Sequence, residues 1–423
     1  MSFIQELKWR GMIHDFIPGL EEQLSKESTT AYVGIDPTAD SLHIGNLVQI
    51  MTMIHFQKNG HKPILLVGGA TGMVGDPSGK DSERKLLSED VIKQNIEGIK
   101  KQLLKFLDFD SNKNSAEIIN NIDWFKDFSF LDFIRDAGKH ITINYMMTKD
   151  SVKSRLETGM SFTEFTYQLV QGYDFYYLFK HKNCKVQLGG SDQWGNIVTG
   201  TELIRKKERG EAYALTTPLI EKADGSKFGK SDGGNIWLDE NKTSAFKFYQ
   251  FWLNTSDEDV EKYLKIFTLL DQKQISDIMK EQVENPHYRV AQKELAKQVT
   301  CLVHSKGKFE LALKASSILF GKSTYDDVAG LSEKDFLNVF EGVPTYEVSE
   351  KNIFKSDIID LLSSHTSVFN SKSEARRMLD SNSVSLNKEK ITIHKKIENK
   401  DLLNDKYLLI QKGKKSYFII IVK

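Results

Sequence analysis

The chain has 423 residues, with 58 Lys and Arg against 58 Asp and Glu and a hydrophobic content of 39%, so we expect a globular protein of about two to four domains. The balanced charge excludes a wholly basic nucleic-acid binder, and no apolar run reaches the ~20 residues that a membrane span needs. Two cysteines are too few for a disulfide framework, and the polar start of the chain lacks a secretory signal, which predicts a cytoplasmic protein without membrane contact.

The first part of the chain alternates predicted strands and helices. Residues 30–35 (TAYVGI) predict a strand, and apolar residues then recur at three- and four-residue intervals from 44 to 54, which predicts a helix. Residues 63–68 predict a second, buried strand. This succession is typical of an α/β fold with a Rossmann-like, doubly wound parallel sheet. Ligands bind beyond the carboxyl ends of such strands, so the turns 36–43 and 68–80 are the expected binding regions.

The first of these turns places Thr38, His43 and Asn46 around the start of the predicted helix. Free backbone N–H groups and the positive end of the helix dipole favour an anion at this point. Gly45 leaves room for a nucleotide to approach the backbone. Taken alone, the turn is also compatible with an ordinary helix cap and an incidental histidine.

The second turn is dense in glycine over residues 68–79, which lets the backbone pass close to a ligand or simply makes a flexible loop. Asp76 is the carboxylate that we expect to face a substrate ammonium, and Lys80 and Arg84 follow in a loop able to reach pyrophosphate. No G-x-G-x-x-G follows the opening strand, and neither lysine-containing glycine stretch of the chain has P-loop spacing. A dinucleotide enzyme and a P-loop ATPase are therefore poor alternatives.

A helix is predicted over residues 162–179, where Tyr167, Gln171 and Asp174 fall on one face at i, i+4 and i+7. A hydroxyl, an amide and a carboxylate on one stripe form either a polar recognition surface or a solvent-facing stripe. The strand predicted at residues 185–188 then runs into a glycine turn and an acidic residue, an arrangement that offers a carboxylate to ribose hydroxyls.

Residues 227–231 read Lys-Phe-Gly-Lys-Ser and are preceded by Asp-Gly-Ser. We call residues 227–231 the lysine loop, because its two lysines and its flexible glycine can bring cations onto phosphates. Together with residues 43–46 (HIGN), it resembles the paired signatures of class I aminoacyl-tRNA synthetases. The helix at 162–179 narrows the resemblance to bacterial tyrosyl-tRNA synthetases. The family motif usually has His where this chain has Asn46, and Asn can still donate a hydrogen bond to a phosphate or ribose oxygen.

The resemblance spans nearly the whole chain and implies a set of site residues. The residues expected to bind tyrosine are Tyr32, Asp76, Tyr167, Gln171, Asp174, Gln187 and Gln193. Among them, Tyr32 and Asp174 are implied at the phenol oxygen. The residues expected to bind ATP are Gly34, Asp36, His43, Gly45, Gly189, Asp192 and Lys230. The residues expected to stabilise charge during catalysis are Thr38, His43, Asn46, Lys80, Arg84, Lys227, Lys230 and Ser231.

The C-terminal part of the chain has helical periodicity after residue 237 and a basic end. Residues 352–423 contain 14 Lys and Arg against 8 Asp and Glu, which indicates a polyanionic partner. A basic helix with Lys372, Arg376 and Arg377 resembles the small RNA-binding module of a ribosomal protein and of bacterial tyrosyl synthetases. A solvated charged helix is the alternative.

The sequence thus predicts four regions. They are a Rossmann-like catalytic domain at 1–225 with a dimer-forming insertion near 120–159, the lysine loop with an all-helical domain at 226–325, a linker at 326–351 and a small α+β RNA-binding domain at 352–423.

The predicted function is tyrosine–tRNA ligation, with ATP as substrate, Mg²⁺ accompanying ATP and no protein metal site, and L-tyrosine, tRNA-Tyr and a second copy of the chain as partners. The alternatives are a tryptophanyl-tRNA synthetase and an RNA-binding protein on an inactive synthetase scaffold.

Overall fold

The computed structural model describes residues 1–78, 86–111, 113–153, 159–226, 228–231, 234–320, 324–340, 343–413 and 416–423, with the backbone alone at 230, 231 and 320. The chain divides into two compact units. The first comprises residues 1–243 and 252–303, and the second comprises residues 244–251 and 304–423. Helix α12 (Ala245–Leu253) contains residues of both.

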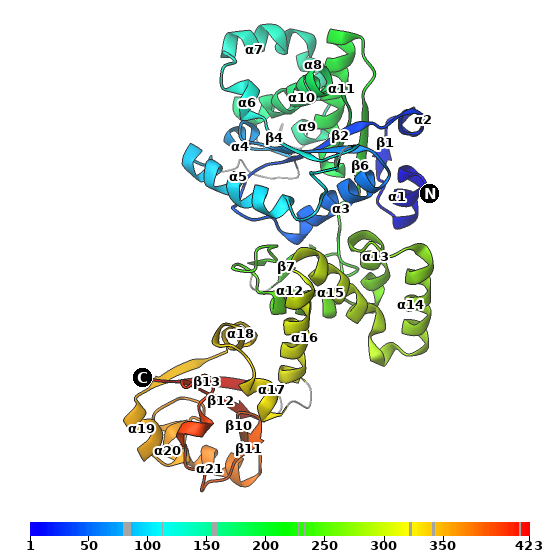
Figure 1. Ribbon diagram of the computed structural model, residues 1–423. Coiled ribbons are helices and arrows are strands. Elements are labelled where there is room, and N and C mark those ends of the chain that lie inside the picture. The colour runs from blue at the N-terminus through cyan, green and yellow to red at the C-terminus, as the bar shows by residue number, and fades with distance from the viewer. Residues whose placement is uncertain are drawn as a thin grey trace. The chain divides into compact units, whose positions relative to one another are not determined.

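The first unit is built on a six-stranded sheet with the order β1-β6-β5-β2-β3-β4 (Figure 1). Its strands are β1 (Asp15–Phe16), β2 (Thr30–Ile35), β3 (Lys62–Val67), β4 (Glu117–Asn120), β5 (Cys184–Gly190) and β6 (Tyr213–Thr217). All neighbours are parallel except β1, which runs antiparallel to β6. From β2 the chain adds β3 and β4 on one side of the sheet and later β5 and β6 on the other side. The strand order therefore reverses at β2, and a crevice opens at its carboxyl end. The predicted doubly wound α/β sheet is confirmed.

Helices cover both faces of this sheet: α10 and α11 lie on one face, and α3 and α5 lie on the other (Figure 1). The helices of the first unit other than α12 are α1 (Phe3–Arg10), α2 (Leu20–Lys26), α3 (Ile44–Lys58), α4 (Thr71–Val74), α5 (Glu89–Leu103), α6 (Ile122–Phe125), α7 (Phe130–Asp136), α8 (Ile143–Met147), α9 (Asp150–Lys153), α10 (Phe162–Lys182), α11 (Trp194–Glu208), α13 (Asp257–Phe267), α14 (Gln272–Glu284) and α15 (Val290–Val303). Short elements are η1 (Gly138–His140), η2 (Ser191–Gln193), η3 (Pro286–Tyr288), β7 (Lys230–Ser231) and β8 (Gly234–Asn235).

Close packing of α10 on α11 fixes the stripe that carries the predicted tyrosine-binding side chains. A Cβ added to Gly200 would lie 2.8 Å from the Cβ of Phe175, and one added to Gly172 would lie 3.3 Å from the backbone N of Gly200. Glycine at these two positions therefore lets the helices approach, so that Phe175 and Tyr32 become fully buried against each other, with ring centroids 5.4 Å apart.

The second unit holds a five-stranded sheet with the order β11-β10-β12-β13-β9 (Figure 1). Its elements are α16 (Lys306–Phe320), α17 (Tyr325–Ala329), α18 (Glu333–Val339), β9 (Thr345–Val348), α19 (Glu350–Lys355), α20 (Ile358–Ser363), α21 (Lys372–Asp380), β10 (Val384–Leu386), β11 (Glu389–Lys390), η4 (Asn399–Asp401), β12 (Tyr407–Lys412) and β13 (Ser416–Val422). Leu408 and Ile410 of β12 pack into one core and Tyr407 and Leu409 into another, so both faces of the sheet are covered.

The stretch 326–351, expected to be a linker, contains α18, most of α17 and β9. Strand β9 pairs in parallel with β13 and is therefore part of the C-terminal sheet. These elements are short, so their periodicity is too weak to distinguish them from loop. The division of the chain into four regions otherwise stays a prediction.

In the part of the chain that the structure describes, every helix is too short or too polar to cross a membrane.

Candidate active site

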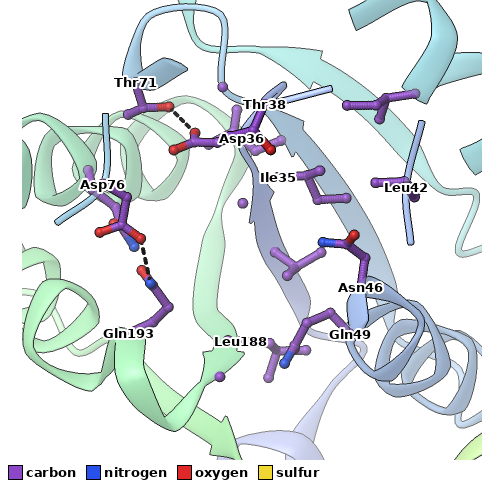
Figure 2. Close-up of a pocket in the computed structure, with 18 of the residues that line it drawn as sticks. Ile35, Asp36, Thr38, Leu42, Asn46, Gln49, Thr71, Asp76, Leu188 and Gln193 are labelled. Carbon is purple, nitrogen blue, oxygen red and sulfur yellow. Dashed lines mark hydrogen bonds between the residues drawn. The ribbon is translucent and has the colours of Figure 1, made fainter. Parts of the chain in front are cut away.

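A cavity of about 470 Å³ opens at the carboxyl ends of β2 and β5, where the strand order reverses (Figure 2). Its lining includes fourteen residues expected from the sequence: Tyr32, Gly34, Asp36, Thr38, His43, Asn46, Asp76, Tyr167, Gln171, Asp174, Gln187, Gly189, Asp192 and Gln193. Residues as far apart in the sequence as Gly34 and Gln193 therefore line one pocket. Their binding of substrate stays a prediction.

Asp174 and Tyr32 form a buried polar pair in this pocket. Asp174 is 1% exposed, and burial raises the pKa of its carboxyl well above the usual range, while hydrogen bonds from Asn121 and Trp124 act in the opposite direction. Tyr32 is fully buried, and its hydroxyl has no hydrogen-bond partner within the described residues. Burial, followed by the charge of Asp174, raises the pKa of this hydroxyl well above 10. An orphaned buried hydroxyl costs about 1–3 kcal/mol, which a polar ligand atom would recover.

Asn121 and Trp124 were not expected at the site from the sequence. The Nδ2 of Asn121 and the Nε1 of Trp124 each donate to the Asp174 carboxylate at 3.0 Å. Asn121 also accepts from the Ala70 N–H at 2.6 Å, which fixes the orientation of its amide. A signal was present, because Asn121 directly follows β4 and so lies at the same edge of the sheet as the pocket.

Side-chain oxygens gather on the side of the pocket formed by the β2 and β3 turns. Asp36 accepts from the hydroxyl of Thr71 and Asp76 accepts from Gln193, both at 2.7 Å (Figure 2). Asp36 also accepts from the hydroxyl of Tyr167 at 2.7 Å. Burial, with the nearby Asp36 and Asp76, raises the pKa of the Tyr167 hydroxyl well above 10, so it stays a donor.

Two amide oxygens add to this acceptor set. The Oε1 atoms of Gln171 and Gln187 are buried and have no hydrogen-bond partner within the described residues. Carboxylates and amide carbonyls can only accept hydrogen bonds, whereas an ammonium can only donate them. The arrangement is therefore suited to a bound ammonium group.

The start of α3 forms a helix cap whose residues His43 and Asn46 line the cavity. The Nδ1 of His43 accepts from the Gly45 N–H at 3.0 Å, and the Oδ1 of Asn46 accepts from the His43 N–H at 3.0 Å. Both motif residues thus act as a capping box, which is the structural alternative considered for this turn. The same bond to Nδ1 places the proton of a neutral His43 ring on Nε2, where it is a donor. A Cβ on Gly45 would lie 2.8 Å from the His43 ring, so only glycine leaves the ring in this position.

The β5 turn also lines the cavity. A Cβ on Gly189 would meet Ile197 of α11 at 3.0 Å, so glycine lets β5 and α11 approach this closely. Asp192 lines the cavity, and burial, followed by the charge of Asp76, raises the pKa of its carboxyl. The Asp192 carboxylate and the start of α3 therefore line one cavity, and their expected roles toward ribose and phosphate stay a prediction.

The two signature segments lie against each other. The Ile44 N–H donates to the Ile236 carbonyl at 3.0 Å, and the Ile236 N–H donates to the Gly229 carbonyl at 3.1 Å. Gly229 has φ +87°, and a Cβ there would lie 3.2 Å from Cγ1 of Ile44. The backbone of the lysine loop at Gly229 thus passes beside the start of α3. Lys80, Arg84 and Lys227 lie outside the described residues, as do the side chains of Lys230 and Ser231.

In the second unit, α21 borders a surface hollow of about 620 Å³. Its lining is Lys372, Ser373, Arg376, Arg377, Asp380 and Ser381, which includes the three predicted RNA-binding residues. Lys372 is paired with Asp360 of α20, so one of the three cations already has a protein partner.

Comparisons with known families cover most of the chain. The family described as tRNA synthetases class I (W and Y) matches residues 24–321. The family described as tyrosine–tRNA ligase SYY-like C-terminal domain matches residues 335–420.

Curated relatives match over their full length. Tyrosine–tRNA ligase of Flavobacterium psychrophilum is 58% identical over 429 residues, covering 100% of both chains, and that of Porphyromonas gingivalis W83 is 58% identical over 430 residues with the same coverage. Among solved structures, a C-terminally truncated mitochondrial tyrosyl-tRNA synthetase of Aspergillus nidulans superposes with a TM-score of 0.67 at 34% identity, covering 74% of this chain and 92% of that one.

Proposed function

The chain belongs to the tyrosine–tRNA ligases of the class I tRNA synthetases, and from this premise we propose how its pocket divides the reaction among named residues. The enzyme joins tyrosine to tRNA and uses ATP as a substrate. The observation that carries the assignment of the pocket is the buried pair of Tyr32 and Asp174. A phenol hydroxyl between them would donate to the carboxylate and accept from the Tyr32 hydroxyl. An indole would bring a donor but no oxygen to accept from Tyr32.

The tyrosine ammonium is proposed to lie among the acceptors of the β3 turn and α10. Asp76, Gln171 and Tyr167 surround this position, with Gln187 and Gln193 orienting the side chain and the carboxylate, respectively. Phenylalanine would fit the same volume but leave the Tyr32 hydroxyl without a partner, while Asp174 would keep only its bonds from Asn121 and Trp124, so the pocket would reject it.

Activation is proposed to be a direct displacement. A tyrosine carboxylate oxygen forms a bond to the α-phosphorus of ATP, the bond from that phosphorus to the bridging oxygen breaks, and pyrophosphate leaves with the electron pair. A terminal ribose hydroxyl of tRNA-Tyr then attacks the activated carbonyl, the bond from that carbon to the phosphate oxygen breaks, and AMP leaves while the hydroxyl proton passes to the departing phosphate. The protein supplies position and positive charge, so the proposed catalytic residues are Thr38, His43, Asn46, Lys80, Arg84, Lys227, Lys230 and Ser231.

The adenosine part of ATP is proposed to lie between Gly34, Gly45 and Gly189, with Asp192 accepting from the ribose hydroxyls. In the described residues no three His, Cys, Asp or Glu side chains are grouped so as to hold a metal. We therefore propose that Mg²⁺ is bound by the phosphates it accompanies, where it would offset their charge.

The surroundings of the site complete the proposal. Large apolar side chains of α7, α8 and the start of α10 are exposed, with Phe130 at 63%, Leu131 at 69%, Ile143 at 68% and Phe162 at 67%. An apolar surface of this kind supports a homodimer formed through the insertion.

The basic hollow at α21 is proposed to bind tRNA-Tyr. We propose a cytoplasmic location without membrane contact, where ATP and tRNA are available.

Trp124→Phe is expected to lower the discrimination between tyrosine and phenylalanine about 10-fold, because one buried donor to Asp174 is lost. The aromatic packing on Tyr177, whose ring centroid lies 4.3 Å away, would largely remain. Pyrophosphate exchange measured with each amino acid gives the ratio. Tyr177→Leu is the control, since it removes the packing and keeps the donor. An unchanged ratio for Trp124→Phe would show that the indole N–H has no part in reading the phenol.

A further inference from the structure

The segment leading into the lysine loop is bound by α13. The Ala223 N–H donates to both carboxylate oxygens of Asp259, at 3.0 and 3.2 Å. One turn further along the helix, the Lys262 ammonium donates to the Glu221 carbonyl at 2.8 Å. Asp259 is only 6% exposed and is oriented by the Ser256 hydroxyl, which donates to it at 2.9 Å. Hydrogen bonds that involve a charged group are stronger than neutral ones, so these bonds define where the segment starts.

A tight turn connects this attachment to the lysine loop. The Gly225 N–H donates to the Lys222 carbonyl at 2.9 Å, and the Lys222 N–H donates to the Ser226 carbonyl at 3.1 Å. Gly225 has φ +75°, a conformation that glycine adopts without strain. The Asp224 carboxylate accepts from the Ser226 N–H at 2.8 Å. With both its ends bonded, the turn can transmit a displacement of Ala223 to the residues that follow.

A second attachment follows within the lysine loop itself. The ring of Phe228 stacks on Phe267 with centroids 5.2 Å apart and an interplanar angle of 14°, and it lies 5.1 Å from the ring of Tyr263 and 5.9 Å from that of Trp252. These three surrounding rings are buried. In the sequence, the attachments at Ala223 and Phe228 stand on either side of Lys227. Helix α13 thus holds this segment by its backbone on one side and by an aromatic ring on the other.

Helix α13 is in turn fixed to the part of the fold that carries the HIGN motif. The buried Arg10 of α1 donates to the carbonyls of Lys265, Thr268 and Leu270 at 2.6, 3.0 and 2.8 Å, which satisfies acceptors at and beyond the C-terminal end of α13. α13 also packs against α3, whose first turn holds the ring of His43. Helix α13 therefore connects the lysine loop to α3, which carries the turn proposed to bind phosphate.

We propose that Asp259 is a positioning residue for tyrosine activation. It acts through the Ala223 backbone to place the lysine loop opposite the start of α3, and it touches neither ATP nor tyrosine. The gain arises in the transition state, because a 1 Å error in the place of a cation weakens its interaction with charge that develops on the leaving phosphates. This inference rests on the proposed role of the lysine loop.

The test is a double-mutant cycle between Asp259 and Lys230 in the full-length enzyme. Asp259→Ala alone is expected to lower the rate constant of adenylate formation about 10-fold, with the Kd of tyrosine unchanged within about 2-fold. In the Lys230→Ala background the same substitution is expected to cost less, about 3-fold, because Lys227 is then the only lysine of the loop left to be positioned. Asp259→Asn keeps one acceptor for the Ala223 N–H and is expected to restore part of the rate.

Matched variants keep the test decisive. Glu258→Ala removes an exposed carboxylate from the same first turn of α13 and is expected to leave the rate unchanged. Lys262→Met, at an exposed position where the fold is not at risk, is expected to give a smaller loss of the same kind, about 3-fold. An equal loss from Asp259→Ala in both backgrounds, or no loss with tyrosine binding intact, would overturn the proposal. A Lys230→Ala enzyme that activates tyrosine normally would instead overturn the role of the lysine loop.

Discussion

Lys230→Ala is expected to slow tyrosyl-adenylate formation by about 10²–10³-fold while tyrosine binds with nearly its original Kd. The lysine is proposed to act on charge that develops on the leaving pyrophosphate, so its contribution appears in the transition state and not in the ground state. Single-turnover formation of the adenylate at saturating ATP, together with equilibrium binding of tyrosine, measures the two effects separately.

Two further variants show whether the effect of Lys230→Ala comes from the lost positive charge at this position. Lys230→Arg keeps the charge and is expected to restore part of the rate, although the shape of its head group differs. Lys273→Ala removes an exposed lysine of α14 and is expected to have no effect. A parallel loss of rate and of tyrosine affinity in Lys230→Ala would mean that the lysine supports the pocket as a whole, and the proposed catalytic role would be wrong.

The triple variant Lys372→Ala, Arg376→Ala, Arg377→Ala is expected to raise the KM for tRNA roughly 100-fold, at about 1 kcal/mol for each of three phosphate contacts. Because those contacts release counterions, the slope of affinity against salt is expected to fall by about one for each lost contact. Adenylate formation is expected to be unchanged, because the pocket residues belong to the first unit and the three cations to the second. Aminoacylation at several salt concentrations and pyrophosphate exchange test the two parts.

A control triple separates position from charge. Lys355, Lys390 and Lys396 are exposed and lie outside α21 in the same unit. Replacing these three with alanine removes the same net charge. If both triples raise the KM for tRNA equally, the hollow at α21 has no special role, and the basic end of the chain binds RNA through its overall charge.

The sequence predicted those elements of the fold and site that have a clear strand or helix periodicity. The order of β2, α3 and β3 followed from local patterns, and their turns lie at the pocket because parallel strands end at one edge. The residues of one helix face, Tyr167, Gln171 and Asp174, also came to line one cavity, because their spacing alone places them together.

Contacts between residues far apart in the sequence were beyond such reasoning. The bond from Asn121 to Asp174 joins positions 53 residues apart, and that from Ala223 to Asp259 joins positions 36 apart. No local period marks the residues involved, and each becomes meaningful only when the fold has brought its partner close. The capping role of His43 was open for a related reason, since a residue can cap a helix and face a ligand at once.

Pyrophosphate exchange into ATP, compared for tyrosine, tryptophan and phenylalanine in one assay, tests the central claim most directly. The buried pair of Tyr32 and Asp174 predicts exchange with tyrosine at a rate at least ~100-fold above that with phenylalanine, because without the phenol the buried Tyr32 hydroxyl has no partner and Asp174 loses one donor. No exchange above background is expected with tryptophan. Comparable exchange with phenylalanine or tryptophan would contradict the assignment of this pair to the phenol.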